Sequence, residues 1–150
     1  MPLANFESTL FGSCHCGELR VEFSTSLEPT AFTPRACDCS FCLKHGAAYI
    51  SDPVGRLDVV VSTDGLRKYR QGSQTAEFLL CNRCGVLVVV TFEHASCVYG
   101  AVNARCLDAN IRLGNPAPVS PQVLTPEERV ERWSRLWVPD VRLVATGTTS

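Results

Sequence analysis

Seven of the nine cysteines in this chain fall into three tight groups, and this grouping constrains the fold more than any other feature. No secretory signal follows Met1, so we interpret the protein as cytoplasmic, where thiols stay reduced. Close-set reduced cysteines bind metal or do chemistry more often than they form disulfides. The groups are Cys14-His15-Cys16-Gly17, Cys37-Asp38-Cys39-Ser40-Phe41-Cys42 and Cys81-Asn82-Arg83-Cys84-Gly85.

The first and third groups together predict one metal site. Each offers two sulfurs from a tight turn that ends in glycine, which relieves crowding where backbone N–H groups point at sulfur. Four thiolates from two turns make a closed tetrahedral Zn²⁺ site, and metal binding then contributes to folding. The alternative is four reduced cysteines buried in the core. We predict that the ligands of a structural zinc are Cys14, Cys16, Cys81 and Cys84.

The second group supplies three sulfurs and no fourth cysteine nearby. Three protein ligands and one open position are typical of catalytic zinc, and the open position can take a substrate thiol and hold it as the nucleophilic thiolate. We therefore predict a catalytic zinc, bound by Cys37, Cys39 and Cys42. Other interpretations remain open: a redox disulfide between two of these cysteines, a metal-free cluster, or a closed site. The residues that would close the site are Asp38, His45, Cys97 and Cys106, and His45 is also the best candidate for an acid or base.

Length and charge limit the class of protein. The chain has 150 residues, which suits a single domain spanning residues 1–150 with a hydrophobic core of its own. Its net charge of −1 argues against a nucleic acid or an anionic membrane surface as the main partner, because such binders are usually basic. The longest apolar stretch, residues 86–90, is far too short to span a membrane.

The hydrophobic pattern predicts a mainly β protein. Leu19, Val21 and Phe23 alternate with charged residues, as in a half-buried strand. The nearly all-apolar stretch 86–92 predicts a central strand covered on both faces. Residues 1–11 are interpreted as a lead-in, and Asp64-Gly65 predicts a turn from which residues 66–70 return as a hairpin with 57–61. Further strands are predicted at 47–51, 76–80 and 97–102.

The last third of the chain has a different sequence pattern from the strands before it. Four prolines in residues 114–126 predict a surface crossing within the same domain. A late C-terminal helix follows, with Thr125 as N-cap, Pro126 at the first helical position and Glu128 completing a capping box. Trp133 and Trp137 share a face of this helix, and we interpret them as core packing.

With these groups set out, the chain resembles the glutathione-dependent formaldehyde-activating enzyme (GFA) family. The resemblance rests on the order of three motifs within residues 11–102: G-S-C-H-C-G at 12–17, C-D-C-S-F-C at 37–42 with K-H-G-A after it, and C-N-R-C-G at 81–85. It implies an Mss4-like zinc-binding β-sheet fold and the same two ligand sets. Asp38 and Leu80 depart from the residues common in the family, but neither position is expected to bind metal.

The resemblance implies a zinc-dependent carbon–sulfur lyase that adds a thiol such as glutathione to formaldehyde or a similar small carbonyl. The alternative is a non-catalytic Mss4-like binding module in which zinc serves folding only. A redox enzyme similar to the methionine sulfoxide reductases would need Cys106 as its nucleophile. The sequence identifies neither the natural thiol nor its contacts, although Lys44 and Arg83 lie beside cysteine turns and are candidates to meet a substrate carboxylate.

Overall fold

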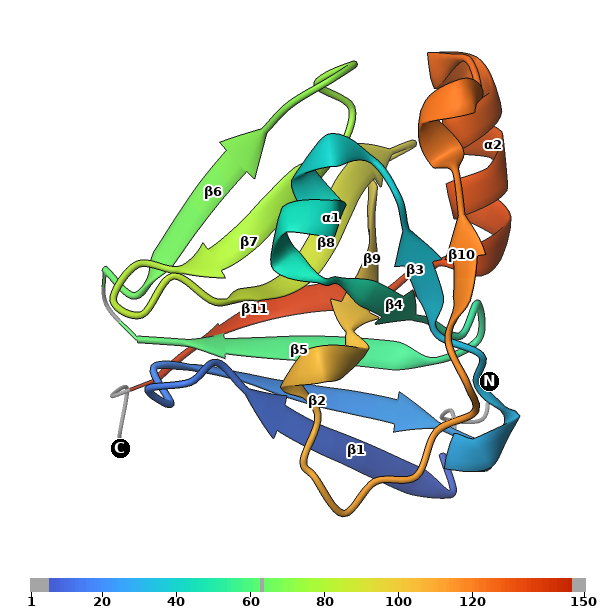
Figure 1. The fold of residues 1–150 in the computed structure, drawn as a ribbon. Helices are drawn as coiled ribbons and strands as arrows, with labels where there is room; N and C mark the ends of the chain where they lie inside the picture. The colour runs from blue at the N-terminus through green and yellow to red at the C-terminus, as the bar shows by residue number, and fades with distance from the viewer. Residues whose placement is uncertain (1–5, 63, 147–150) are drawn as a thin grey trace.

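The computed structural model describes residues 6–62 and 64–146, and its strands form two sheets (Figure 1). The four-stranded sheet has the order β1-β2-β5-β11, and the seven-stranded sheet has the order β10-β3-β4-β9-β8-β7-β6. The first sheet consists of β1 (Ser8–Ser13), β2 (Leu19–Thr25), β5 (Arg56–Val61) and β11 (Val141–Ala145). The second consists of β3 (Arg35–Cys37), β4 (Ala48–Ile50), β6 (Leu66–Arg70), β7 (Glu77–Cys81), β8 (Leu87–His94), β9 (Cys97–Asn103) and β10 (Ala117–Val119). The predicted mainly β fold is confirmed.

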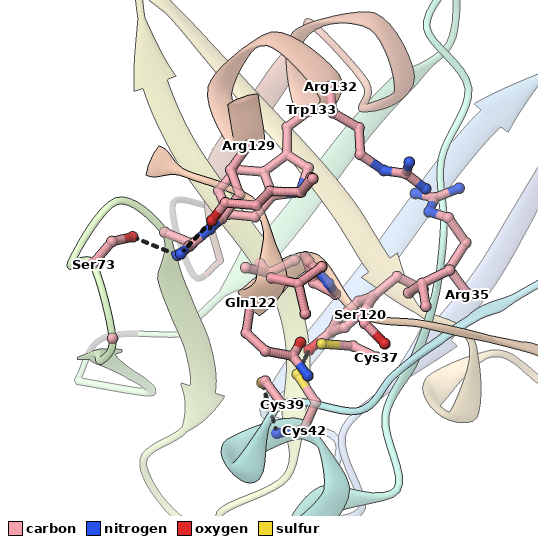
Figure 2. Close-up of a pocket in the computed structure, with 18 of the residues that line it drawn as sticks. Arg35, Cys37, Cys39, Cys42, Ser73, Ser120, Gln122, Arg129, Arg132 and Trp133 are labelled. Carbon is pink, nitrogen blue, oxygen red and sulfur yellow. Dashed lines mark hydrogen bonds between the residues drawn. The ribbon is translucent and has the colours of Figure 1, made fainter. Parts of the chain in front are cut away.

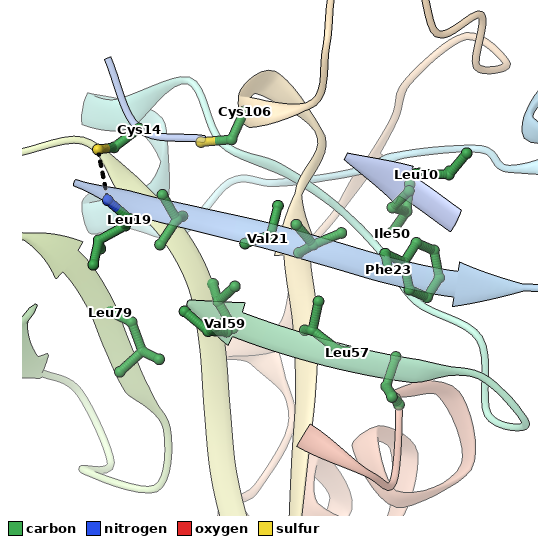
Figure 3. Packing of buried hydrophobic residues seen from close by; sticks show 14 of the residues in the cluster. Leu10, Cys14, Leu19, Val21, Phe23, Ile50, Leu57, Val59, Leu79 and Cys106 are labelled. Carbon is green, nitrogen blue, oxygen red and sulfur yellow. Dashed lines mark hydrogen bonds between the residues drawn. The ribbon is translucent and has the colours of Figure 1, made fainter. Parts of the chain in front are cut away.

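The core lies between the facing sides of the two sheets. Leu19, Val21 and Phe23 of β2 are fully buried, as their alternation predicts, and they pack with Leu57 and Val59 of β5 (Figure 3). Strand β8 lies between β7 and β9, and its first six residues are buried, so the predicted central strand is also confirmed. This core holds the turns at the strand ends in fixed positions.

Two of the strand predictions are wrong. Residues 8–11 of the predicted lead-in, residues 1–11, belong to strand β1, which pairs antiparallel with β2 along its whole length. Residues 1–5 of that lead-in lie outside the described residues. Strands β5 and β6 do not form a hairpin: β5 pairs with β2 and β11, whereas β6 pairs with β7. The predicted turn does exist, since the Gly65 N–H donates to the carbonyl of Ser62 and Asp64 has a φ of 61°. It carries the chain from one sheet to the other because the burial of β5 favours its two neighbours in the first sheet.

Among the described residues, two α-helices accompany the sheets: α1 (Ser40–His45), which is short and was not predicted, and the predicted late helix α2 (Pro126–Leu136). Three short 3-10 helices lie at Pro29–Ala31, Ala104–Cys106 and Pro121–Val123. Thr125 caps α2 and forms the predicted capping box with Glu128. The rings of Trp133 and Trp137 stack at a centroid distance of 4.6 Å, and both contact Phe92 of β8. The tryptophans thus attach α2 to the second sheet. Within the described ranges, no helix has the length and apolar character needed to cross a membrane.

The proline-rich crossing, residues 114–126, contains strand β10. This strand pairs in parallel with β3, the strand that leads into the second cysteine group. The backbone N–H of Asp38 donates to the carbonyl of Val119, and the Asp38 carboxylate accepts hydrogen bonds from Ser120 and Gln122. The crossing is therefore attached beside the second cysteine group.

Gly12, which lies just before the first cysteine group, allows β1 to pass close to the backbone of Cys106. A Cβ at this position would collide with the backbone carbonyl of Cys106. We expect Gly12→Ala to destabilise the protein by about 1–3 kcal/mol, because the 104–107 segment must move away from β1. Urea unfolding measures the change. Thr9→Ala, at an exposed position of the same strand, is the control, and equal midpoints for the two variants would contradict the prediction.

Candidate functional site

The first and third cysteine groups lie together at the ends of two hairpins. Cys14 and Cys16 lie in the turn between β1 and β2, whereas Cys81 is the last residue of β7 and Cys84 lies in the turn between β7 and β8. The two turns are built alike. In each, the first cysteine's N–H donates to a carbonyl five residues later, and the closing glycine has a positive φ, 87° at Gly17 and 82° at Gly85.

The geometry of these four sulfurs fits a tetrahedral metal. They lie within 4.8 Å of one another. The Cys16 sulfur is 3.7 Å from that of Cys14 and 3.6 Å from that of Cys81, too far apart for disulfides. A zinc–sulfur bond of about 2.3 Å places the corners of a tetrahedron about 3.8 Å apart. The four cysteines predicted as structural ligands therefore form a set that can hold a metal ion, consistent with zinc.

Backbone N–H groups point at two of these sulfurs. The Cys81 sulfur accepts from the N–H groups of Arg83 and Cys84, each at 3.3 Å, and the Cys14 sulfur accepts from the N–H of Leu19 at 3.3 Å. Such donors stabilise thiolate and orient it toward a metal. Cys14 and Cys81 are also nearly fully buried, which would be costly for thiolate charge without a counter-charge.

The second cysteine group is formed by the end of β3 and the start of α1. Cys37 is the last residue of β3, Cys39 is the N-cap of α1, and Cys42 lies inside that helix. The three sulfurs lie within 4.8 Å of one another, so the sequence-predicted trio is brought together. The Cys39 sulfur accepts from the N–H of Cys42 at 3.4 Å, and the Cys42 sulfur lies 3.2 Å from the hydroxyl of Tyr49 in β4.

Among residues 6–62 and 64–146, no fourth cysteine, histidine or carboxylate joins these three sulfurs. The Asp38 carboxylate is held by Ser120 and Gln122. His45 is exposed, with its ring against Phe41, and Cys97 is exposed in the hairpin between β8 and β9. Cys106 is buried, and its thiol donates to the carbonyl of Leu87. The protein residues proposed to close the site are therefore placed elsewhere.

Burial and a hydrogen bond between two of the thiols separate the pKa values of Cys37 and Cys42. A side-chain hydrogen bond with Cys42 lowers the pKa of Cys37 to about 6, in spite of the opposing effect of burial. The same hydrogen bond, followed by burial, raises the pKa of Cys42. Burial and the neighbouring Cys42 also raise the pKa of Tyr49, so its hydroxyl keeps its proton and can donate to sulfur. The cluster thus tolerates thiolate at neutral pH.

The trio lies in the wall of a cavity of about 790 Å³, large enough for a small organic ligand. Aromatic side chains line much of it, and the loop after β6 and the proline-rich crossing complete its rim. The aromatic lining is Tyr49, Phe78, Trp133 and Trp137. The tryptophans predicted only as core packing thus also face a pocket.

Three arginines line the same cavity, and they differ in their surroundings. Arg129 of α2 donates to the carbonyl of Leu124 and to the hydroxyl of Ser73 at 2.8 Å, so it connects the two rims (Figure 2). Figure 2 shows the guanidinium groups of Arg35 and Arg132 next to each other, away from Cys39 and Cys42. Burial, and then the charge of Arg132, lower the pKa of Arg35 to about 10.

Sequence reasoning missed Tyr49 and these arginines. Tyr49 follows the second motif with no spacing rule to mark it, and Arg35 reaches the pocket only because β3 leads into Cys37. A signal was present for α2, since Arg129, Arg132 and Trp133 recur at helical spacing on one face. The candidates that were proposed for a carboxylate lie outside the pocket: Lys44 is exposed, and Arg83 pairs with Glu18 at 3.4 Å.

Two comparisons with known proteins bear on the family and the fold of this chain. The family model described as glutathione-dependent formaldehyde-activating enzyme matches residues 9–124, which include all three cysteine groups. A crystal structure of a Rhodobacter sphaeroides protein is similar, with 23% sequence identity and a TM-score of 0.53 over 89% of this chain and 99% of that chain. The likeness to that structure concerns the fold alone.

Proposed function

This chain belongs to the glutathione-dependent formaldehyde-activating enzyme family, and from that premise we propose that it adds a thiol to formaldehyde or a similar small carbonyl. The reaction class is that of a carbon–sulfur lyase, and glutathione is the first thiol to test. The proposed ligands of the reactive metal are Cys37, Cys39 and Cys42, and those of the structural metal are Cys14, Cys16, Cys81 and Cys84.

One observation carries this proposal: three sulfurs that no fourth protein ligand among the described residues joins line a ligand-sized cavity. The set formed by Cys14, Cys16, Cys81 and Cys84 gives the contrast, since four sulfurs would complete the coordination sphere of a zinc ion without help from a substrate. The four-sulfur set therefore favours a structural role, and the three-sulfur set favours a catalytic one.

When bound to the trio, zinc would supply a Lewis acid with a free coordination position, which favours the thiolate form of a substrate thiol near neutral pH. The chain's own groups prepare that position. The Tyr49 hydroxyl and the N–H of Cys42 hold two of the sulfurs in place. The aromatic wall offers little hydrogen bonding to water, so a bound substrate would displace water there and strengthen the electrostatic interactions in the pocket.

The net reaction conserves atoms and electrons without an oxidant. The substrate sulfur loses its proton and forms a bond to the carbonyl carbon, the carbon–oxygen π pair moves to oxygen, and that oxygen gains a proton. When formaldehyde is the carbonyl, the product is a hemithioacetal that carries an S-hydroxymethyl group. The reverse reaction breaks the same carbon–sulfur bond.

Metal content tests the proposal directly. We expect two zinc ions per chain in protein purified under reducing conditions without chelator, and one in Cys39→Ser, because only the second group loses a ligand. Mass spectrometry of the native protein gives the stoichiometry, and initial rates of thiol loss in the presence of formaldehyde give the activity.

A Ser73→Ala variant is the matched control, since Ser73 lines the same cavity without contributing sulfur. It should retain both metals. One zinc in parent and Cys39→Ser alike, with no acceleration of thiol addition by the parent, would contradict the proposal and favour the non-catalytic binding module.

A further inference from the structure

Two arginines that line the cavity, Arg35 and Arg132, have no carboxylate partner among the described residues. Arg35 donates to the hydroxyl of Ser51 at 2.7 Å, and that hydroxyl donates to the carbonyl of Leu136. Arg132 lines the same part of the cavity from α2. In the part of the chain that the structure describes, neither side chain takes part in an ion pair, although six such pairs occur elsewhere.

Such a pair of like charges is unfavourable unless an anion joins it. Two guanidinium groups at short range repel each other, and partial burial removes water that would screen them. Arg35 is held toward the cavity by Ser51, whose hydroxyl is fixed in turn by the end of α2. Arg129 is different because the Leu124 carbonyl and Ser73 already occupy its donors. Among the described arginines of the cavity, Arg35 and Arg132 therefore keep the most guanidinium N–H groups available to a ligand.

The position of Arg35 relates these donors to the sulfur trio. Arg35 and Cys37 are two residues apart on β3, and alternate residues of a strand face the same side. Both line the cavity, as does Tyr49, the residue opposite Arg35 on β4. A single ligand in this cavity can thus place a thiol sulfur at the trio and an anionic group at the guanidinium pair.

We propose that Arg35 and Arg132 form a carboxylate-binding subsite that makes this pocket selective for acidic thiols. The inference rests on the proposed thiol-adding function and adds its substrate class. Planar guanidinium groups match the two oxygens of a carboxylate, and the charge-assisted hydrogen bonds are stronger than neutral ones. A phosphate would satisfy the same donors, so the test separates the two oxyanions.

The test measures binding of S-methylglutathione and of its diethyl ester by calorimetric titration of the zinc-loaded protein. The methylated sulfur removes thiolate binding as a source of affinity, which isolates the carboxylates. We expect the parent to bind the acid about tenfold to a hundredfold more tightly than the ester, and Arg132→Gln to lose that preference. Arg132→Lys, which keeps the charge, should retain part of it.

Arg135→Gln is the matched control. Arg135 lies on the same helix, but its side chain is 72% exposed and pairs with Glu131. It should behave as the parent does. Equal affinity of the parent for acid and ester, or equal affinity of Arg132→Gln and parent for the acid, would overturn the subsite. Displacement of S-methylglutathione by inorganic phosphate at lower concentration than by succinate would overturn the carboxylate assignment.

The subsite and the proposed function fail in different ways. A parent that accelerates addition of glutathione to formaldehyde, yet binds acid and ester equally, refutes the subsite and leaves the function standing. A parent that binds S-methylglutathione through Arg132, yet does not accelerate the addition, supports the subsite and refutes the function. Circular dichroism of Arg132→Gln shows whether the variant is folded.

Discussion

Cys81→Ser is expected to prevent stable folding of the protein. Cys81 is 1% exposed, and its sulfur accepts hydrogen bonds from two backbone N–H groups and belongs to the four-sulfur set of Cys14, Cys16, Cys81 and Cys84. Metal binding at structural zinc sites contributes about 10–16 kcal/mol in small domains, which is comparable with the 5–15 kcal/mol of net stability of a whole domain. Near-UV circular dichroism and urea unfolding should show a chain without a cooperative transition.

Cys97→Ser is the control for that experiment, because Cys97 is exposed and outside both sulfur sets. It should unfold at the parent's urea concentration. Treating the parent with a strong chelator should reproduce the Cys81→Ser result, since both remove the same metal. If Cys81→Ser unfolds cooperatively at the same urea concentration as the parent, the four-sulfur set of Cys14, Cys16, Cys81 and Cys84 contributes nothing to folding.

Cys42→Ser is expected to abolish acceleration of thiol addition while the fold persists. The trio would lose its most buried sulfur and the contact with Tyr49, and serine does not replace thiolate as a zinc ligand. The loss should be at least about 100-fold, since removal of groups that only support a ligand already costs 10–100-fold. Initial rates of thiol loss, corrected for the uncatalysed addition, measure it.

Tyr49→Phe tests the same contact with a smaller change. The sulfur stays and only the hydroxyl is lost, so we expect about a tenfold loss of zinc affinity at the trio, measured by competition with a chromophoric chelator. Metal at the four-sulfur set of Cys14, Cys16, Cys81 and Cys84 should be unaffected.

If Cys42→Ser keeps the reaction rate of the parent, the cysteine trio is not where the reaction occurs, and the proposed function fails.

The cysteines of both sulfur sets could be predicted from the sequence because each motif that contributes them is short and local. Two sulfurs in one short turn, followed by Gly17 or Gly85, leave few other uses for the segment. The capping box at Thr125 was predictable for the same reason, since all its partners lie within one turn of helix. The nearly all-apolar run 86–92, most of which lies in β8, was also sufficient to predict a central strand.

The remaining features depend on contacts between distant segments. Strand β1 was missed because its residues alternate weakly, and its edge position leaves Phe11 exposed. The hairpin after β5 was mispredicted because the turn at Asp64 specifies a change of direction but not which strand comes to lie beside the next one. The meeting of Arg35 with Arg132 needs the packing of α2 against the second sheet, which no local pattern encodes.

The parallel pairing of β5 with β11 has a consequence for the order of folding. Arg142 of β11 donates to Asp58 of β5 across 84 positions in the sequence, at 2.9 Å. Both sulfur sets lie earlier in the chain than β11, so during synthesis all seven thiols leave the ribosome before the four-stranded sheet can be completed. Contacts of such long range slow folding. A nascent chain that takes up metal early would therefore have its two hairpins joined before its last strand arrives.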